Sequence, residues 1–219
     1  MLHEIKGSDG FAYLDFTLDP GDSLTTEAGA MASMDTELDM TAHLNGGVIK
    51  GFLRKYLGGE SLFINRFQNK TEKPLKLVLT SPTPGSLREI TLNGNSLNLE
   101  GGSYVCSTPD VTLGLRYAGL SSYIGSEGFF KLVVSGQGTV WIGGYGALVD
   151  KLVEGEFIVD SGHLVAYEPQ IKLKTQLSGG LVGSFLGGEG LVTRLEGTGR
   201  VILQTRSVAG LAAWINPRF

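Results

Sequence analysis

Apolar and polar residues alternate in many short stretches of this 219-residue chain. Clear examples are residues 38–42, 111–115 and 171–175. A period of two is typical of a β-strand that has one face in a core and the other in water. The 33 glycines lie mostly in pairs and Gly-x-Gly clusters between apolar runs, which predicts many tight turns because glycine reaches positive φ at little cost. The pattern therefore predicts an all-β fold.

Two short signatures each occur three times and divide the chain into similar stretches. In the first, an acidic residue stands two positions before a glycine, and an apolar residue follows nine positions after that glycine. In the second, a glutamate stands two positions after a glycine and precedes another apolar strand. We interpret these signatures as internal repeats over about 11–86, 87–149 and 150–207. The repeated acids are Glu27, Glu100 and Asp160 in the first signature and Glu60, Glu127 and Glu189 in the second.

The repeats predict a single compact body over 1–219 and not a string of separate domains. Units of this size, each with one buried face, gain stability by packing on one another. The tail from 208 to 214 carries a single glycine and predicts a short C-terminal helix.

Each repeat also contains a segment, between the two signatures, whose apolar residues are spaced by three and four, as in a helix. In the first repeat Lys50, Arg54 and Lys55 give this segment a basic side, which suits an anionic membrane surface or a partner protein. The alternative is that each segment caps the core of its own unit. The candidate interaction surface consists of Phe52, Leu53, Tyr56, Leu57, Leu120, Tyr123, Ile124, Leu181, Val182, Phe185 and Leu186.

Charge and side-chain chemistry argue against several function classes. The net charge of −4 disfavours nucleic acid, whose binding needs clustered Lys and Arg. The single Cys106 rules out an intramolecular disulfide framework and a cysteine-based zinc site, and we predict an inert buried thiol. His3, His43 and His163 form no paired metal motif, so we predict no metal site, no cofactor and no catalytic residue.

The three glutamates of the second signature are the most informative polar residues, and they allow two interpretations. If the repeats were arranged around a threefold axis, Glu60, Glu127 and Glu189 would occupy equivalent places and could bind a cation or shift each other's pKa. We prefer the alternative, in which each carboxylate accepts backbone N–H bonds at its own glycine-rich turn.

Targeting signals do not appear in the pattern. Residues 1–6 lack an apolar h-region, and the apolar runs fall short of the ~20 residues that a membrane span needs. We expect a soluble, cytoplasmic protein.

The ordered signatures resemble those of a bacterial and archaeal family related to the mitochondrial protein altered inheritance of mitochondria 24. The resemblance implies a fold similar to that of the tryptophan RNA-binding attenuation protein: three β-sandwich units, like short double-stranded β-helices, around a pseudo-threefold axis, often oligomerised further. It implies no catalytic residues, and a fold alone does not transfer RNA binding. The stretches that carry the resemblance are 20–21, 27–31, 58–67, 145–147, 160–163, 187–191 and 203–207.

These observations support three hypotheses of function. We prefer a non-enzymatic homo-oligomeric binding or scaffold protein, with peripheral contact to a membrane surface as one version and no nucleic acid as partner. The second hypothesis is a small-molecule or metal-dependent enzyme that uses His43, His163 and the glutamates in a site between repeats. The third is nucleic-acid binding by analogy of fold.

Overall fold

The computed structural model describes residues 1–8, 10–44, 63–117, 130–177 and 191–216, and these residues fold mostly into antiparallel β-sheet. We call the strands within 1–84, 85–147 and 148–204 the first, second and third units. The first unit contains β1 (Leu2–Lys6), β2 (Tyr13–Leu18), β3 (Ser23–Glu27), β4 (Met31–Met34), β5 (Asp39–Leu44), β6 (Phe63–Gln68) and β7 (Leu75–Thr80). The second contains β8 (Gly85–Leu99), β9 (Tyr104–Ser107), β10 (Val111–Tyr117) and β11 (Phe130–Tyr145). The third contains β12 (Leu148–Asp160), the 3-10 turn η1 (Ser161–His163), β13 (Leu164–Tyr167), β14 (Lys172–Leu177) and β15 (Leu191–Gln204). The helix α4 (Val208–Ile215) follows.

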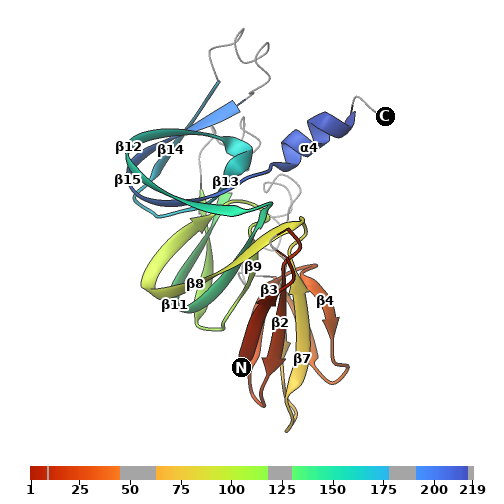
Figure 1. Ribbon diagram of the computed structural model, residues 1–219. Coiled ribbons are helices and arrows are strands. Elements are labelled where there is room, and N and C mark those ends of the chain that lie inside the picture. The colour runs from red at the N-terminus through yellow and green to blue at the C-terminus, as the bar shows by residue number, and fades with distance from the viewer. Residues whose placement is uncertain (9, 45–62, 118–129, 178–190, 217–219) are drawn as a thin grey trace.

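The strands form two sheets. A four-stranded sheet has the order β1-β2-β7-β4, and a larger sheet has the order β12-β15-β13-β8-β11-β9-β3-β6-β5, with β10 on β11 and β14 on β15. Every second residue of β2 is buried, as the alternating sequence requires of a strand with one face in a core. Two pairs of long antiparallel strands, β8 with β11 and β12 with β15, run through the second and third units (Figure 1).

Three hydrophobic cores succeed one another along the molecule. The first is built on residues of β2, β3, β6 and β7, but Val105, Cys106 and Trp141 of the second unit are also part of it. The second core likewise includes residues of the third unit, namely Val165, Ala166 and Ile202. The third core contains third-unit residues alone among those that the structure describes. Each of the first two cores is therefore completed by the unit that follows.

The same irregular strand pairing occurs in all three units. Met31 of β4 pairs with Leu79 of β7, and the register then slips by one residue so that Ser33 pairs with Val78. The pairing of β9 with β11 slips in the same way at Tyr104 and Cys106. In the third unit β13 and β15 repeat this slip at Leu164 and Ala166. The register slip thus occurs in β4, β9 and β13, one strand from each stretch that the sequence predicts to be a repeat.

The all-β prediction is confirmed, and the alternating stretches 38–42, 111–115 and 171–175 coincide with β5, β10 and β14 to within a residue or two. The helix α4 lies in the tail where a short helix is expected. The helical segments expected inside each repeat lie outside the described residues. The arrangement around a pseudo-threefold axis stays a prediction.

Candidate interaction surfaces

Two edge strands, β4 and β12, lie at opposite ends of the molecule (Figure 1). Within the described residues β4 pairs with β7 alone, as the last strand of the four-stranded sheet. Similarly, β12 pairs with β15 alone, as the last strand of the large sheet. An edge strand presents unpaired backbone N–H and C=O groups, which makes it a template for pairing with another chain.

The exposure of β4 contrasts with that of the corresponding strands. All four residues of β9 and all four residues of β13 are buried. In β4 the three residues Met31, Ala32 and Ser33 are exposed, and Met34 is half-buried. The strands that share the register slip are therefore buried in the second and third units and mainly exposed in the first.

A strand of the preceding unit pairs with β9 and another pairs with β13, and the two pairings are of the same kind. The end of β3 pairs with β9 so that Thr26 lies opposite Cys106 and Thr25 opposite Ser107. The end of β8 pairs with β13 in the same register, with Leu99 opposite Ala166. Thr26 and Leu99 each lie three residues before the glycine of the first signature, so the two contacts are equivalent.

The corresponding end of β12 has no such neighbour in the described chain. Asn98 of β8 is only 1% exposed, and its amide group donates to the backbone oxygen of Tyr167. Ile158, which corresponds to Asn98 in β12, is 52% exposed. A hydrophobic side chain is thus exposed on this edge strand, whereas the corresponding Asn98 of β8 is buried against the third unit.

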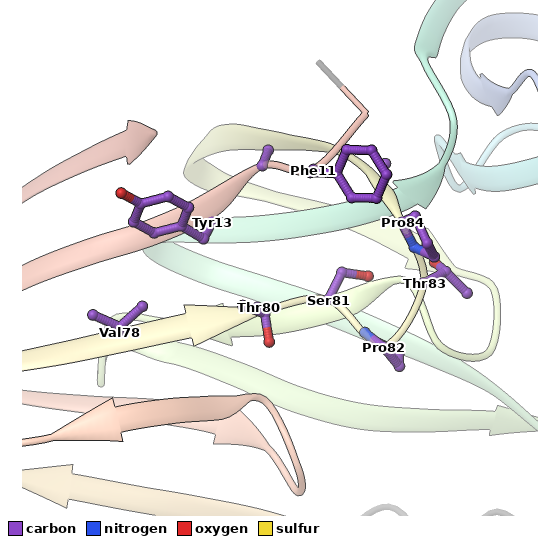
Figure 2. Close-up of a pocket in the computed structure, with 10 residues that line it drawn as sticks. Phe11, Tyr13, Val78, Thr80, Ser81, Pro82, Thr83 and Pro84 are labelled. Atoms are coloured by element: carbon purple, nitrogen blue, oxygen red, sulfur yellow. The ribbon is translucent and has the colours of Figure 1, made fainter. Parts of the chain in front are cut away.

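A surface pocket of about 440 Å³ is lined in part by Val78 and Thr80 of β7, the strand with which β4 pairs. Phe11 and Tyr13 form one wall, and the turn after β7 forms the other (Figure 2). The backbone N–H of Thr80, in the pocket wall, donates to the oxygen of Ala30, the residue directly before β4. The pocket is mainly apolar, and the residues that complete it are Ala12, Val78, Ser81, Pro82, Thr83, Pro84 and Gly85.

The residues proposed from sequence as the interaction surface lie outside the described part of the chain. The same is true of the second-signature acids Glu60, Glu127 and Glu189. The acids of the first signature are described. Glu100 forms a buried ion pair with Lys131, and the carboxylate of Asp160 accepts from the backbone N–H of Gly162, 2.9 Å away.

Two histidine side chains have structural contacts. Nε2 of His3 lies 2.7 Å from a carboxylate oxygen of Glu89, and Nδ1 of His163 lies 2.7 Å from the backbone oxygen of Gln204. His43 is part of β5, opposite Ile64. In the ranges that the structure describes, no three His, Cys, Asp or Glu side chains are grouped closely enough to hold a metal ion.

Cys106 is buried, as predicted, and belongs to the first core. Burial raises the pKa of its thiol well above the ordinary value, because the thiolate would lose its hydration. The contact that sequence reasoning missed is the one this residue makes, between the end of β3 and β9. Its sequence signal is weak: the apolar character of 104–106 and 164–166 is also that of an ordinary core strand.

Comparison with known proteins assigns the chain to a family. Residues 3–206 match the family described as mitochondrial biogenesis AIM24. The chain belongs to the AIM24 family. A relative of this AIM24 chain is the uncharacterized protein M6_Spy0233 of Streptococcus pyogenes serotype M6, which is 24% identical over 221 residues, covering 97% of this chain and 88% of the relative.

The AIM24 chain also resembles a solved structure. The crystal structure of protein SPYM3_0169 from Streptococcus pyogenes superposes with a TM-score of 0.81 at 20% sequence identity, covering 100% of this chain and 99% of that one. At this identity the similarity shows the fold. Among the helices of the described residues, none is long and apolar enough to cross a membrane.

Proposed function

We propose that this protein is a non-enzymatic scaffold that assembles head to tail, with β4 of one copy pairing with the end of β12 of the next. The observation that carries the proposal is the exposure of β4, whose counterparts β9 and β13 are buried. In this proposal the chain contains three copies of one unit in tandem. Three units make two contacts within the chain, β3 with β9 and β8 with β13. They leave β4 at one end and the end of β12 at the other without such a contact in the described chain.

The register of the contact follows from the two contacts inside the chain. Thr26 lies opposite Cys106, and Leu99 opposite Ala166. The corresponding residues are Val159 of β12 and Ser33 of β4, so these two lie opposite each other between copies. Ile158, exposed in the single chain, then lies opposite Met34 and becomes buried.

The cores support the same pairing. Val105, Cys106 and Trp141 complete the first core, and their counterparts in the third unit complete the second. The first-unit counterparts are Ala32, Ser33 and Val78, of which the first two are exposed and the third is half-buried. In the assembly these side chains complete the third core of the neighbouring copy. Burial of apolar surface contributes roughly 25 cal/mol per Å² to such a contact.

Two edge variants test this proposal by sedimentation velocity. Ile158→Lys places a charge in the contact on β12, and Ser33→Lys does so on β4. Each variant alone is expected to stay monomeric at concentrations where the wild-type protein assembles. A mixture of the two is expected to form a dimer and nothing larger, because each variant retains the edge that the other has lost.

The matched control is Leu152→Lys, since Leu152 lies on the same strand as Ile158 and is 54% exposed against 52%. This variant is expected to assemble like the wild-type protein. Wild-type protein that stays monomeric at every concentration, or an Ile158→Lys variant that assembles normally, would contradict head-to-tail pairing. Peripheral membrane contact rests on residues outside the described part of the chain and remains a prediction from the sequence.

A further inference from the structure

The helix α4 presents an apolar surface to solvent. It extends away from the sheets (Figure 1), and none of its residues is buried. Val208, Leu211 and Trp214 are 57%, 40% and 60% exposed. Residues three apart share one face of a helix, so these side chains form a continuous apolar stripe. The stripe is about 9 Å long from Val208 to Trp214 at a rise of 1.5 Å per residue.

The segments that leave each unit follow a common path inside the chain. We call residues 81–84, 144–147 and 205–207 the exit turns, because the chain leaves the last strand of each unit there. The first exit turn lies against the second: the backbone N–H of Gly146 donates to the oxygen of Pro84, and that of Ser86 donates to the oxygen of Gly146. The second lies against the third, where the N–H of Thr205 donates to the oxygen of Ala147. The second and the third exit turn are thus each in contact with the exit turn of the unit before it.

The spacing at the first of these contacts is close. A side chain at Gly85 would place its Cβ in collision with the backbone oxygen of Gly144. The residues that follow the first exit turn, Gly85 and Ser86, therefore pack directly on the second exit turn.

In this pattern the first exit turn has no preceding exit turn against it. The segment after the last exit turn lies on no further exit turn within the described chain. The first exit turn is 81–84, and it forms a wall of the surface pocket of the first unit. The hydroxyl oxygen of Ser81 in this wall is buried and has no hydrogen-bond partner among the described residues. The segment after 205–207 is α4, which contacts η1 and has no buried residue. The open pocket and the apolar helix occupy matching places at opposite ends of the chain.

We propose that α4 of one copy packs into the pocket of the copy whose β4 pairs with its β12, with Leu211 and Trp214 against Phe11 and the exit turn 81–84. This inference rests on the head-to-tail assembly proposed above and names a second contact within it. The volume of about 440 Å³ suits a few apolar side chains and lies in the range of typical binding pockets. In the assembly the helix then provides a second contact between neighbouring copies, in addition to the pairing of the edge strands.

The fluorescence of Trp214 tests the proposal, because the other tryptophan, Trp141, is fully buried and shielded from quencher. Pockets cover roughly 70–90% of a ligand's surface, so acrylamide quenching of Trp214 should fall about three- to tenfold on assembly. The monomeric Ile158→Lys variant supplies the unassembled value. Phe11→Glu, at a residue 72% exposed, should leave Trp214 readily quenched while sedimentation still shows assembly. Leu152→Glu is the matched control and should behave as the wild-type protein.

The outcomes separate the two proposals. Assembled wild-type protein in which Trp214 is quenched as easily as in Ile158→Lys would overturn the docking of α4 and leave edge pairing intact. Protection of Trp214 that persists in Phe11→Glu would place the helix somewhere else and overturn the docking as well. Wild-type protein that never assembles would overturn both.

Discussion

Truncation of Trp141 is expected to destabilise the first unit, although the residue belongs to the second. Trp141 is fully buried in the first core, where its ring makes an edge-on contact with Phe16 at a centroid distance of 5.1 Å. It makes a second edge-on contact with His3, at 4.9 Å. Removal of a buried Trp side chain costs about 3–5 kcal/mol, including the cavity it leaves. We expect Trp141→Ala to lie in the upper half of that range, since each aromatic contact adds about 0.5–1.5 kcal/mol.

Trp141→Phe provides the comparison that isolates packing. The indole N–H of Trp141 is buried without a hydrogen-bond partner among the described residues. An unsatisfied buried donor costs roughly 1–3 kcal/mol, so the phenyl ring loses some packing and also relieves this penalty. We expect Trp141→Phe to cost less than half as much as Trp141→Ala.

Urea unfolding followed by far-UV circular dichroism measures both changes in dilute solution. Trp214→Ala is the control for the loss of a tryptophan, and it should alter the free energy of unfolding by less than about 0.5 kcal/mol because Trp214 is 60% exposed. A cost below about 1 kcal/mol for Trp141→Ala would refute the idea that the second unit completes the first core. If Trp141→Ala and Trp141→Phe lowered the free energy of unfolding by equal amounts, the unsatisfied indole N–H would not carry the penalty assigned to it.

Three further predictions concern ion pairs and the helix cap. Lys131→Met should cost about 3–5 kcal/mol in urea unfolding because Glu100, only 12% exposed, loses its ionic partner, and the double variant with Glu100→Leu should recover most of that loss. The hydrogen bond from Lys6 is the main cause that lowers the pKa of Asp15, so this carboxylate stabilises the fold above its ordinary pKa and less as pH falls through the lowered value. Urea midpoints of wild type and Asp15→Asn should therefore differ at pH 7 and converge near pH 2. Ser207→Ala should speed amide exchange in α4 about fivefold through loss of the N-cap, worth about 1 kcal/mol, without altering global unfolding, and Ser207→Asp should restore protection.

Local patterns in the sequence were sufficient to predict the strands. The alternation at 38–42, 111–115 and 171–175 predicts which residues face a core, and those stretches coincide with β5, β10 and β14. Alternation does not specify which strand lies beside which. The pairing of Thr26 with Cys106 joins residues 80 positions apart, and such contacts depend on the whole fold.

The exposed surfaces on β4 and β12 could not be predicted from the sequence either, because exposure also depends on which strands lie side by side. The four residues of β4 and their counterparts in β9 and β13 are all small or apolar enough for a core. Exposure of β4 arises because no other unit of the described chain covers it, which is a property of position along the chain and not of composition. The sequence drew attention to the apolar segments before Glu60, Glu127 and Glu189, whereas the described residues place an open contact on β4 and Ile158.

Head-to-tail pairing has a consequence for the size of the assembly. The contact joins two different surfaces, so the pairing of one copy with a second regenerates both free edges, β4 at one end and β12 at the other. Such a heterologous contact ends either in a ring, if the rotation between copies closes, or in an open filament. A ring appears in sedimentation as one species that does not grow with concentration, and a filament appears as a distribution that does. The two contacts inside the chain fix the rotation from one unit to the next. Ring or filament is then decided by the flexibility of the contact between copies, and α4 packed in the pocket would restrict that flexibility. Deletion of α4 is therefore expected to broaden the distribution of sizes, and a distribution unchanged by the deletion would mean that the strand contact alone sets the geometry.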